Sequence, residues 1–308
     1  DILSYRELSK LLGTYIDTLP DLLGADGRLH AKFLQAGTTT GRMSSENPNL
    51  QNIPIKTELG RNIRKAFVAP KNKVLLSFDY SQIELRIAAI LSGDNSLKEI
   101  FQKGEDIHTG VASRIFNVTP ENVDKEMRRK AKVINFGILY GMGVTALRQN
   151  LGGTREEAQE FYSQYFKSFP GLAEYMENTK NEALRFGYTK TIFGRRRYFE
   201  GLKSKLPFIR ASAERMAINA PIQGTQSDIL KIAMARIDKY LKEKKLEKDV
   251  LLLLQIHDEL IYEVPEGGVE NLAKDIKKIM ESILSEKDGA GVPIEVNFCF
   301  GKNWGELK

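Results

Sequence analysis

Short apolar runs predict three buried β-strands in this chain. The first run covers 74–80, and the other two, 251–256 and 260–264, stand close together near the C-terminus. Only the sequence HDE at 257–259 separates the last two runs, and Pro265 follows them. Because proline is excluded from most strand interiors, it marks the end of the third strand. The last two runs therefore predict a hairpin with the polar residues at or near its bend.

Helical spacing of apolar residues dominates the middle of the chain. Directly after 74–80, apolar residues recur at helical spacing. The members of this stripe are Ile83, Ile87, Ile90 and Leu91. From about 96 to 200, further helices are separated by Gly and Pro residues. A helix over about 208–219 is expected to stop at Pro221, and a new helix is expected after Gly224.

The two ends of the chain contain the remaining strand signals. Residues 24–62 are rich in Gly, Asn, Thr and Ser, which predicts loops and short strands, and 2–16 look helical. The C-terminal part adds a helix over about 268–286 and a strand over 293–300. The chain is therefore predicted to be an α+β protein, with antiparallel strands toward both ends and a helical block between them.

Composition limits the class of protein. The 308 residues are 42% hydrophobic and 28% charged, which is typical of a soluble globular protein of about two domains. No apolar stretch approaches a membrane span, and no signal-peptide pattern is visible. The single Cys299 excludes an internal disulfide framework and suits a reducing cytosol. A net charge of +6 suits a polyanionic partner. Because the sequence begins at Asp1, a fragment or processed product is expected.

Two of the predicted strands each deliver a carboxylate to an exposed end. Asp79 ends the first strand just before a helix, and Asp258 lies in the hairpin. Ser81 is a better helix cap than Asp79, so Asp79 has no evident structural need. If the strands are neighbours in one sheet, the two aspartates converge on an oxygen-ligand site that suits Mg²⁺ or Mn²⁺, not zinc. Paired carboxylates that hold two such ions are typical of phosphoryl or nucleotidyl transfer.

A basic helix is predicted over 125–143. Its apolar face consists of Met127, Ala131, Ile134 and Ile138. A second stripe recurs every four residues and consists of Arg128, Lys132, Phe136 and Tyr140. A solvated basic flank is the simpler interpretation, but two aromatic residues are unusual there. Arg and Lys can hold a triphosphate, and Phe and Tyr can stack on a base. The absence of a G-x-x-x-x-G-K-[ST] segment disfavours a P-loop NTPase.

Seven segments of this sequence resemble family A DNA polymerases, the bacterial DNA polymerase I type. Three resemble the polymerase motifs of the family: DYSQIELR (79–86), RRKAKVINFGILYG (128–141) and QIHDELIYEVP (255–265). Four are similar to further family segments: TTTGRMSSENPNLQNIP (38–54), DIHT (106–109), FGRRR (193–197) and APIQGTQSD (220–228). Because these segments follow the family's order over essentially all 308 residues, the resemblance is specific.

The resemblance implies a right-hand polymerase fold. The palm, an antiparallel sheet, would be built from 25–90 and 220–308, and the inserted helical fingers would be 91–219. Only 1–24 resemble the end of the thumb, so the thumb would be largely absent. Weak binding of duplex DNA and poor processivity are therefore expected, and no proofreading site is assigned within the chain.

The resemblance also implies roles at the carboxylate site. Asp79 and Asp258 match the metal-binding aspartates, and the backbone carbonyl of Tyr80 would add a ligand to one ion. Glu259 matches the acid that accompanies them, closer to the primer end. The implied cofactor is a pair of Mg²⁺ ions, with Mn²⁺ as the alternative.

Further residues match the family's contacts to the incoming nucleotide. Arg128 and Lys132 match the residues that grip the triphosphate, and Lys132 is the candidate proton donor to the departing pyrophosphate. His108 and Gln82 match additional contacts to the phosphates.

Three residues match positions around the base and the sugar. Phe136 would stack on the incoming base, and Tyr140 would occupy the template position until the fingers close. Glu84 would be the steric gate, because a bulky acid beside the second carbon of the sugar leaves no room for a ribose hydroxyl.

Eight residues match positions that touch primer or template. Amide and guanidinium groups suit a sequence-independent enzyme, because the minor-groove acceptors are similar for every base pair. The eight are Arg42, Asn49, Gln51, Asn52, Arg215, Asn219, Gln223 and His257. The implied partners are primer-template DNA and deoxynucleoside triphosphates, with no membrane, for a monomer in the bacterial cytosol or nucleoid. The implied activity is template-directed extension of a primer 3′ hydroxyl, with release of pyrophosphate, in DNA replication or repair.

Three alternatives remain open from the sequence. A single-subunit RNA polymerase shares the logic of palm and fingers, but Glu84 argues against ribonucleotides. A metal-dependent nuclease could share the carboxylates, but it would not need the stripe from Arg128 to Tyr140. A non-catalytic nucleic-acid-binding fragment is disfavoured by the presence of Asp79, Asp258 and Lys132, although the missing thumb keeps it open.

Overall fold

The chain divides into two compact, discontinuous units. The computed structural model describes residues 1–54 and 57–307. The first unit comprises Asp1–Ser81, Leu230–Ile283 and Val296–Lys308, and the second comprises Gln82–Ile229 and Leu284–Glu295. Three residues of the expected palm, Ile55, Lys56 and Lys308, lie outside the described residues. Segments 82–90, 220–229 and 284–295 were also expected in the palm but belong to the second unit, so the division into palm, fingers and thumb stays a prediction.

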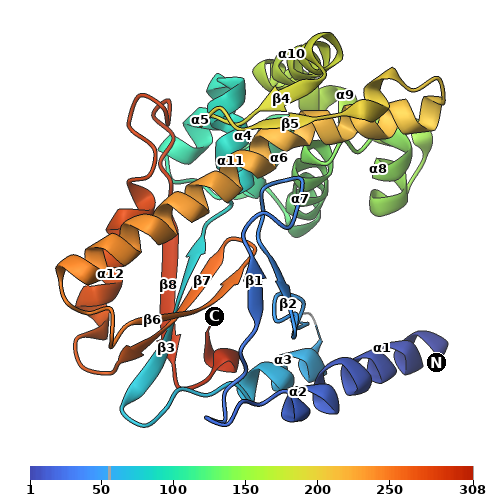
Figure 1. The fold of residues 1–308 in the computed structure, drawn as a ribbon. Helices are drawn as coiled ribbons and strands as arrows, with labels where there is room; N and C mark the ends of the chain where they lie inside the picture. Colours follow the sequence, from blue (N-terminus) through green and yellow to red (C-terminus); the bar gives the residue numbers. More distant parts are fainter. Residues whose placement is uncertain (55–56, 308) are drawn as a thin grey trace. The chain divides into compact units, whose positions relative to one another are not determined.

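A four-stranded sheet forms the centre of the first unit. Its strands are β6 (Leu251–Ile256), β7 (Glu259–Pro265), β3 (Lys73–Tyr80) and β8 (Val296–Gly301), in that order (Figure 1). Every neighbouring pair is antiparallel. The structure therefore confirms the expected mixture of helices and antiparallel strands, and it confirms the hairpin between β6 and β7.

Strand β3 is almost entirely apolar because both of its faces are covered. On one face, Leu76 and Phe78 are fully buried, and Phe78 meets Tyr262 of β7 edge-on. The Tyr80 hydroxyl on this face donates a hydrogen bond of 3.0 Å to the carbonyl of Met280 in α12 (Val269–Glu281). The other face carries alternate residues of β3, including Asp79 at its end.

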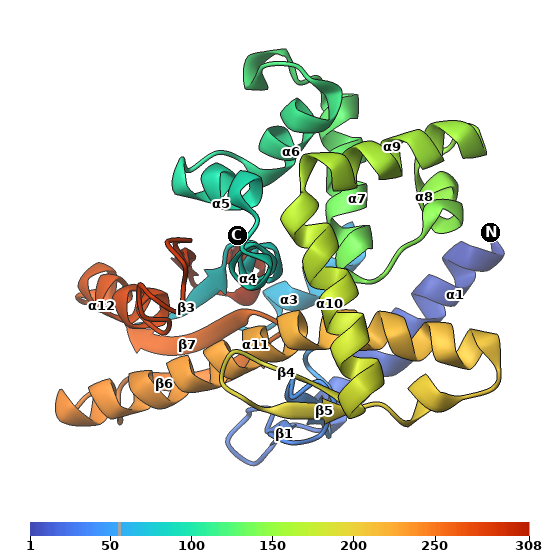
Figure 2. The same cartoon turned by 90° about the horizontal axis from the view of Figure 1, so that it is seen from above.

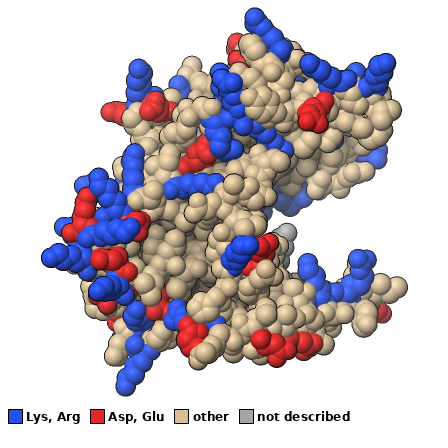
Figure 3. Space-filling model, in the orientation of Figure 1, with Lys and Arg blue, Asp and Glu red and all other residues tan. Residues whose placement is uncertain are grey.

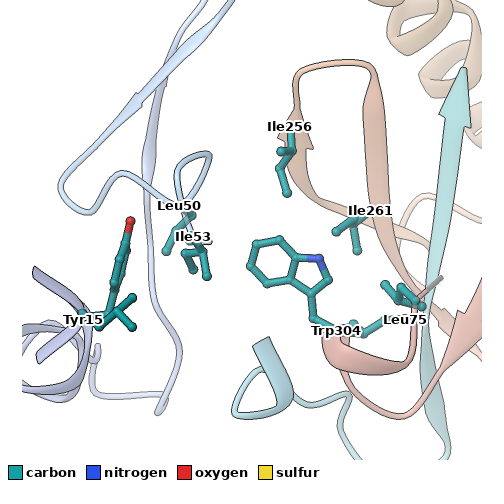
Figure 4. Packing of buried hydrophobic residues seen from close by; sticks show 9 residues of the cluster. Tyr15, Leu50, Ile53, Leu75, Ile256, Ile261 and Trp304 are labelled. Atoms are coloured by element: carbon teal, nitrogen blue, oxygen red, sulfur yellow. The ribbon is translucent and has the colours of Figure 1, made fainter. Parts of the chain in front are cut away.

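A cluster around Trp304 covers the second face of the sheet. Figure 4 shows the Trp304 indole between the sheet and the loop around Leu50. The buried members are Leu11, Tyr15, Leu50, Ile53, Leu75, Ile256, Ile261, Trp304 and Leu307. The Tyr15 hydroxyl also donates a hydrogen bond of 2.7 Å to the carbonyl of Asn52. This cluster therefore fixes the loop of 49–53 against the sheet, next to the hairpin.

Short elements complete the first unit. The predicted helical segment of 2–16 is confirmed and ends in a π-helical turn, and loops with short strands follow it. These elements are α1 (Ile2–Leu11), η1 (Leu12–Ile16), α2 (Thr18–Asp21), β1 (Lys32–Leu34), β2 (Ser44–Glu46), α3 (Glu58–Lys65) and η4 (Trp304–Glu306). Among the described helices, none combines the length and the apolar character that crossing a bilayer requires.

The second unit is mainly helical, as Figure 2 shows. Its elements are α4 (Ile83–Ser92), α5 (Asn95–Gln102), α6 (Ile107–Phe116), η2 (Pro120–Asn122), α7 (Lys125–Leu139), α8 (Val144–Leu151), α9 (Arg155–Ser168), α10 (Pro170–Phe186), β4 (Tyr188–Lys190), β5 (Arg196–Tyr198) and η3 (Glu200–Lys203). The buried carboxylate of Asp94 caps two of these helices. It accepts hydrogen bonds of 3.0 Å from the Leu97 amide in α5 and 2.8 Å from the Gly171 amide in α10.

The predicted break at Pro221 is wrong. Helix α11 runs without interruption over Pro207–Glu243 and contains this proline. An interior proline costs roughly 3 kcal/mol, but the apolar side chains on both sides of it are buried. Gly224 is also not a helix end. A Cβ there would lie 2.7 Å from Thr191 Cγ2, so glycine allows the β4–β5 turn to approach the helix.

The predicted cap of α4 is also wrong. Gln82, not Ser81, occupies the N-cap position, and its side chain makes no capping hydrogen bond. Gln82 has φ 51° and ψ 37°, a left-handed conformation that is uncommon for residues other than glycine, asparagine and aspartate. The sharp exit from β3 into α4 therefore depends on the left-handed backbone conformation of Gln82.

Candidate active site

The two predicted carboxylate strands are neighbours in the sheet. β3 and β7 pair in a register that places Asp79 directly opposite Glu259. The backbone amide of Tyr80 donates a hydrogen bond of 3.3 Å to the carbonyl of Asp258. Directly opposite residues of antiparallel strands point to the same face. The structure therefore brings together the acids that the sequence analysis selected.

The hairpin that carries Asp258 has a two-residue turn. Strand β6 ends at Ile256 and β7 begins at Glu259, and these two residues pair with each other. His257 has φ 53°, in the left-handed region. Two-residue hairpin turns need positive φ because only such turns match the twist of the strands. Exposed His257 therefore holds the strained position, and Asp258 is fixed beside β3.

Burial and two neighbouring carboxylates disfavour ionisation of Asp79. Burial, followed by the charges of Asp258 and Glu259, raises the pKa of Asp79 to about 7. Burial also raises the pKa of Asp258, although a backbone hydrogen bond and the charges of His257 and Arg42 oppose this change. The Asp79 side chain still reaches solvent, so an ion or a substrate has access to it.

Glu259 differs from the two aspartates in its partners. Burial raises its pKa, and a hydrogen bond from the Ser77 hydroxyl and the charge of Arg64 counteract the increase. Arg64 is buried, lies 4.3 Å above the Trp304 ring and donates a hydrogen bond of 3.1 Å to the carbonyl of Ile53. Sequence analysis missed both partners. The alternation of β3 places Ser77 on the face of Asp79 and could have identified it, whereas no local signal points to Arg64.

The donor set fits a divalent cation of the magnesium type. Asp79 and Asp258 offer clustered carboxylate oxygens whose mutual repulsion a cation would relieve. Among the residues that the structure describes, no three His, Cys, Asp or Glu side chains are placed to hold one metal ion. Two carboxylates leave coordination positions for backbone, water or substrate oxygens, which is usual for Mg²⁺.

The basic helix is confirmed as α7. Its predicted apolar face is inside, with Ala131, Ile134 and Ile138 buried. Its second stripe is exposed and consists of Arg128, Lys132, Phe136 and, at the C-cap, Tyr140. The helix is shorter than the expected 125–143, because the chain turns at Tyr140 and the next residue, Gly141, has φ 70°.

Arg128 is paired with an acid from the DIHT segment. Its guanidinium donates two hydrogen bonds to the carboxylate of Asp106, one from Nε at 3.0 Å and one from Nη2 at 2.9 Å. Asp106 also caps α6 by accepting a 2.8 Å hydrogen bond from the Thr109 amide. Burial raises the pKa of Asp106, but the hydrogen bonds from Arg128 and Thr109 outweigh it and lower the pKa to about 2. An anionic ligand of Arg128 must therefore replace a fully ionised carboxylate.

His108 is buried and neutral. Only 4% of the residue is exposed, and burial lowers its pKa to about 4. Asn135 Nδ2 lies 3.2 Å from His108 Nδ1, and the ring of Phe136 lies 5.6 Å from the imidazole between centroids. If Nδ1 accepts this hydrogen bond, the proton of the neutral ring is on Nε2. His108 can then donate a hydrogen bond from Nε2 but carries no charge near pH 7.

Glu84 and Tyr140 are linked to each other. The Tyr140 hydroxyl donates a hydrogen bond of 2.9 Å to Glu84 Oε2. The two residues were predicted to have separate roles, and they are 56 positions apart, with no sequence signal of the contact. A cavity of about 810 Å³ opens beside Tyr140 along the C-terminal half of α7 and the loop after it. Its lining includes Lys132, Phe136 and Arg215.

The eight predicted DNA contacts are divided between the units. Five lie in the first unit: Arg42, Asn49, Gln51, Asn52 and His257. Gln51 Nε2 donates hydrogen bonds to Gln255, of 3.0 Å to its carbonyl and 2.9 Å to Oε1. Gln255 in turn donates to the carbonyl of His257 at 3.0 Å. The loop of 49–52 is thus connected to the hairpin that carries Asp258.

The remaining three predicted DNA contacts lie on α11 in the second unit. Arg215, Asn219 and Gln223 follow one another at four-residue spacing, which places them along one side of the helix. Arg215 is exposed, Gln223 is half-buried and Asn219 is buried. On the face drawn in Figure 3, Lys and Arg side chains are spread over both units and are interspersed with Asp and Glu.

Comparisons with known proteins find DNA polymerases as relatives. The chain is 49% identical over 308 residues, 100% of its length, to "DNA polymerase I, thermostable" of Thermus filiformis and covers 36% of that protein. It is 48% identical over 308 residues to DNA polymerase I of Chloroflexus aurantiacus and covers 32% of it. The chain thus spans about a third of the length of these curated relatives.

A solved structure has the same fold. It is described as the POL domain of Pol1 from M. smegmatis in complex with DNA primer-template and dNTP. The match has a TM-score of 0.92 and 43% sequence identity, and it covers 99% of this chain and 53% of that chain. The family model described as DNA polymerase family A matches residues 1–306. From these matches, which extend over almost the whole sequence, the chain belongs to DNA polymerase family A.

Proposed function

We propose that this chain carries the catalytic centre of a template-directed DNA polymerase. It would add deoxynucleotides to a primer 3′ hydroxyl and release pyrophosphate, in DNA replication or repair. The observation that carries the proposal is the pairing of β3 with β7, which places Asp79 beside Asp258 and Glu259. Family membership supports the reaction, and the primer-template and dNTP in the matched structure support the partners.

Asp79, Asp258 and the carbonyl of Tyr80 would hold the divalent ions. Two Mg²⁺ ions, with Mn²⁺ as the alternative, would when bound activate the primer hydroxyl and stabilise the charge on the reacting phosphates. The chain's own contribution is to hold two carboxylates at one sheet end, in an order fixed by the strand register. The raised pKa of Asp79 is consistent with a site that is completed by a cation.

Residues of the second unit would bind the triphosphate. Arg128 would exchange its two hydrogen bonds to Asp106 for two to a phosphate, which accepts the same planar geometry. Exposed Lys132 would bind the triphosphate and donate the proton to the departing pyrophosphate. His108, through Nε2–H, and Gln82 would add hydrogen bonds to the phosphates.

Sugar and base selection would use Glu84, Phe136 and Tyr140. The hydrogen bond from Tyr140 would help to orient the Glu84 carboxylate, which would act as a steric gate against a ribose hydroxyl. Exposed Phe136 would stack on the incoming base, and Tyr140 would hold the template position before the nucleotide binds.

The primer-template would contact the eight polar residues named above. Their two groups, on the segment of 42–52 with His257 and on one side of α11, offer donors suited to minor-groove acceptors. In terms of the family's architecture, we propose that 25–90 and 220–308 form the palm, 91–219 the fingers and 1–24 the end of the thumb. We propose a monomer located in the bacterial cytosol or nucleoid.

Primer extension by an Asp258→Asn variant tests the proposal. This substitution keeps the size of the side chain but removes its charge, so extension should fall by at least about a thousandfold while DNA affinity stays within about threefold. Asp249→Asn changes an exposed aspartate just before β6 and is the matched control, which should extend normally. Extension by Asp258→Asn at the parental rate would contradict the proposal. A parent chain that binds primer-template but never extends it would favour the non-catalytic alternative.

A further inference from the structure

Glu259 lies as close to Asp79 as the sheet allows. The two residues are direct partners in the antiparallel register, and their side chains share one face. Cβ atoms in such pairs are roughly 4.5–5.5 Å apart. A glutamate side chain is long enough to cover that distance, so nothing in the backbone prevents a third carboxylate from joining Asp79 and Asp258.

The Glu259 carboxylate is instead bound to a neighbouring side chain of β3. Ser77 Oγ donates a hydrogen bond to Glu259 Oε1. Ser77 precedes Asp79 by two residues, so it lies on the same face of β3, and only 3% of it is exposed. The charge of Arg64 also acts on Glu259, and Arg64 is itself fixed by the Ile53 carbonyl.

We propose that Ser77 is a positioning residue that sets the number of protein ligands at the ion site. Its hydroxyl binds Glu259 and so keeps the ligand set to Asp79 and Asp258. This inference rests on the proposed function, because it assumes that these two aspartates hold the ions. It agrees with the absence, among the described residues, of any three side chains that could hold one metal.

A two-carboxylate set has a functional advantage. Affinity for divalent ions increases with the number of charged ligands, and each protein ligand occupies a coordination position that a substrate oxygen would need. Holding Glu259 aside would leave positions open for phosphate and hydroxyl oxygens. Removal of the Ser77 hydroxyl should therefore release Glu259 toward the ions and tighten their binding before any substrate is present.

Mn²⁺ binding by the whole chain without DNA tests this inference. The electron paramagnetic resonance signal of free Mn²⁺ reports binding directly and does not depend on activity. Ser77→Ala should lower the Mn²⁺ dissociation constant about three- to tenfold. Ser77→Thr keeps a hydroxyl and should bind like the parent. Ser45→Ala removes another buried serine of the same unit, 4% exposed, and should also bind like the parent.

Two further variants test whether Glu259 is the residue that Ser77 holds away from the ions. Glu259→Gln in the parent background should leave Mn²⁺ affinity within about twofold, because Glu259 is held aside. Glu259→Gln combined with Ser77→Ala should abolish the tightening. If Glu259→Gln loses as much affinity as Asp258→Asn, Glu259 is already a ligand and the inference is wrong, even if Ser77→Ala does not fold.

The outcomes separate the inference from the proposed function. Parental binding that depends on Asp258, together with Ser77→Ala equal to Ser45→Ala, would overturn the role of Ser77 alone. A parent that shows no binding dependent on Asp258 would overturn both the role of Ser77 and the proposed ion site.

Discussion

Asp79 combines exposure to solvent with a charge environment that disfavours its ionised form. Its pKa is raised from 3.8 to about 7 by burial and by Asp258 and Glu259. Between these two pH values the folded chain retains a proton that the unfolded chain has released. The free energy of unfolding therefore falls as the pH rises from about 4 to about 7, and the loss is complete above the folded pKa.

Asp79→Asn should consequently stabilise the chain at high pH. At pH 8 in EDTA we expect a gain of about 1 kcal/mol, because solvent screening reduces the effect at an exposed group. Below about pH 4 the variant and the parent should be equally stable. Urea denaturation at both pH values measures the difference, with Asp249→Asn as the control. The same gain at pH 4 and pH 8 would show that the charge of Asp79 is not the cause.

The effect of Mg²⁺ on the stability of the parent and of Asp79→Asn tests whether the ion binds at Asp79. Added Mg²⁺ should stabilise the parent at pH 8, because an ion that binds the folded state shifts the unfolding equilibrium. It should stabilise Asp79→Asn less, because this variant lacks one of the proposed ion ligands. Equal stabilisation of both proteins would mean that Mg²⁺ does not bind at Asp79.

Glu84 accepts a hydrogen bond from Tyr140 that both a carboxylate and an amide can accept, so size and charge can be separated at this residue. Glu84→Ala should raise the ratio of ribonucleotide to deoxynucleotide incorporation at least about tenfold, the scale of a 1–3 kcal/mol change in a pocket. Glu84→Gln keeps the size and an acceptor for the Tyr140 hydroxyl, so its ratio should stay close to that of the parent. Competitive kcat/KM measurements distinguish the two. A similar increase in both variants would mean that charge, and not bulk, excludes ribonucleotides.

At the scale of elements, the hydrophobic pattern predicted strands and helix faces correctly where each element buries its own apolar residues. The apolar runs located β3, β6 and β7, and the four-residue spacing on α7 separated a buried face from an exposed one. The pattern failed at α11, where Pro221 and Gly224 suggested a break. Tertiary contacts decide that segment, since the β4–β5 turn packs against the glycine.

Asp94 shows why contacts between elements could not be predicted from the sequence. Its carboxylate caps α5 three residues away and α10 at Gly171, 77 residues away. The first contact is a standard capping pattern, whereas the second depends on how α5 and α10 pack. The partner of Arg128 was missed for the same reason, because Asp106 lies 22 residues earlier, at the N-cap of α6.

Asp94→Ala should therefore cost more than the loss of an ordinary cap. It removes hydrogen bonds from two helices and leaves buried amides without a partner, so we expect a loss of about 2–4 kcal/mol. Asp124→Ala removes an exposed cap from α7 only and should cost about 1 kcal/mol. Denaturant titrations compare the two variants. Equal losses would mean that water replaces Asp94 at the start of α10.

At the scale of the whole molecule, the net charge and the order of the motifs could be determined from the sequence, but the register between β3 and β7 could not. A net charge of +6 and basic residues on both units suit a polyanion without selecting one. The motif order identified the family, and the pairing of Asp79 with Glu259 required coordinates.

DNA binding by this chain should be strongly dependent on salt. If several Lys and Arg residues contact phosphates, the affinity for primer-template should fall at least about tenfold between 50 and 200 mM salt. Fluorescence anisotropy at a series of salt concentrations gives the slope. A flat response would argue against phosphate contacts, and a non-nucleic polyanion such as heparin tests whether charge alone is sufficient.

The register between β3 and β7 has a consequence for how this protein can change over evolution. Side chains alternate between the faces of a strand, so one inserted or deleted residue within β3 would turn Asp79 toward the side of Leu76 and Phe78. A two-residue change would restore the face but displace the carboxylate by about 6.6 Å along the strand. Homologues can therefore exchange many side chains in β3, whereas the number of residues between Lys73 and Asp79 should be the same in every active descendant.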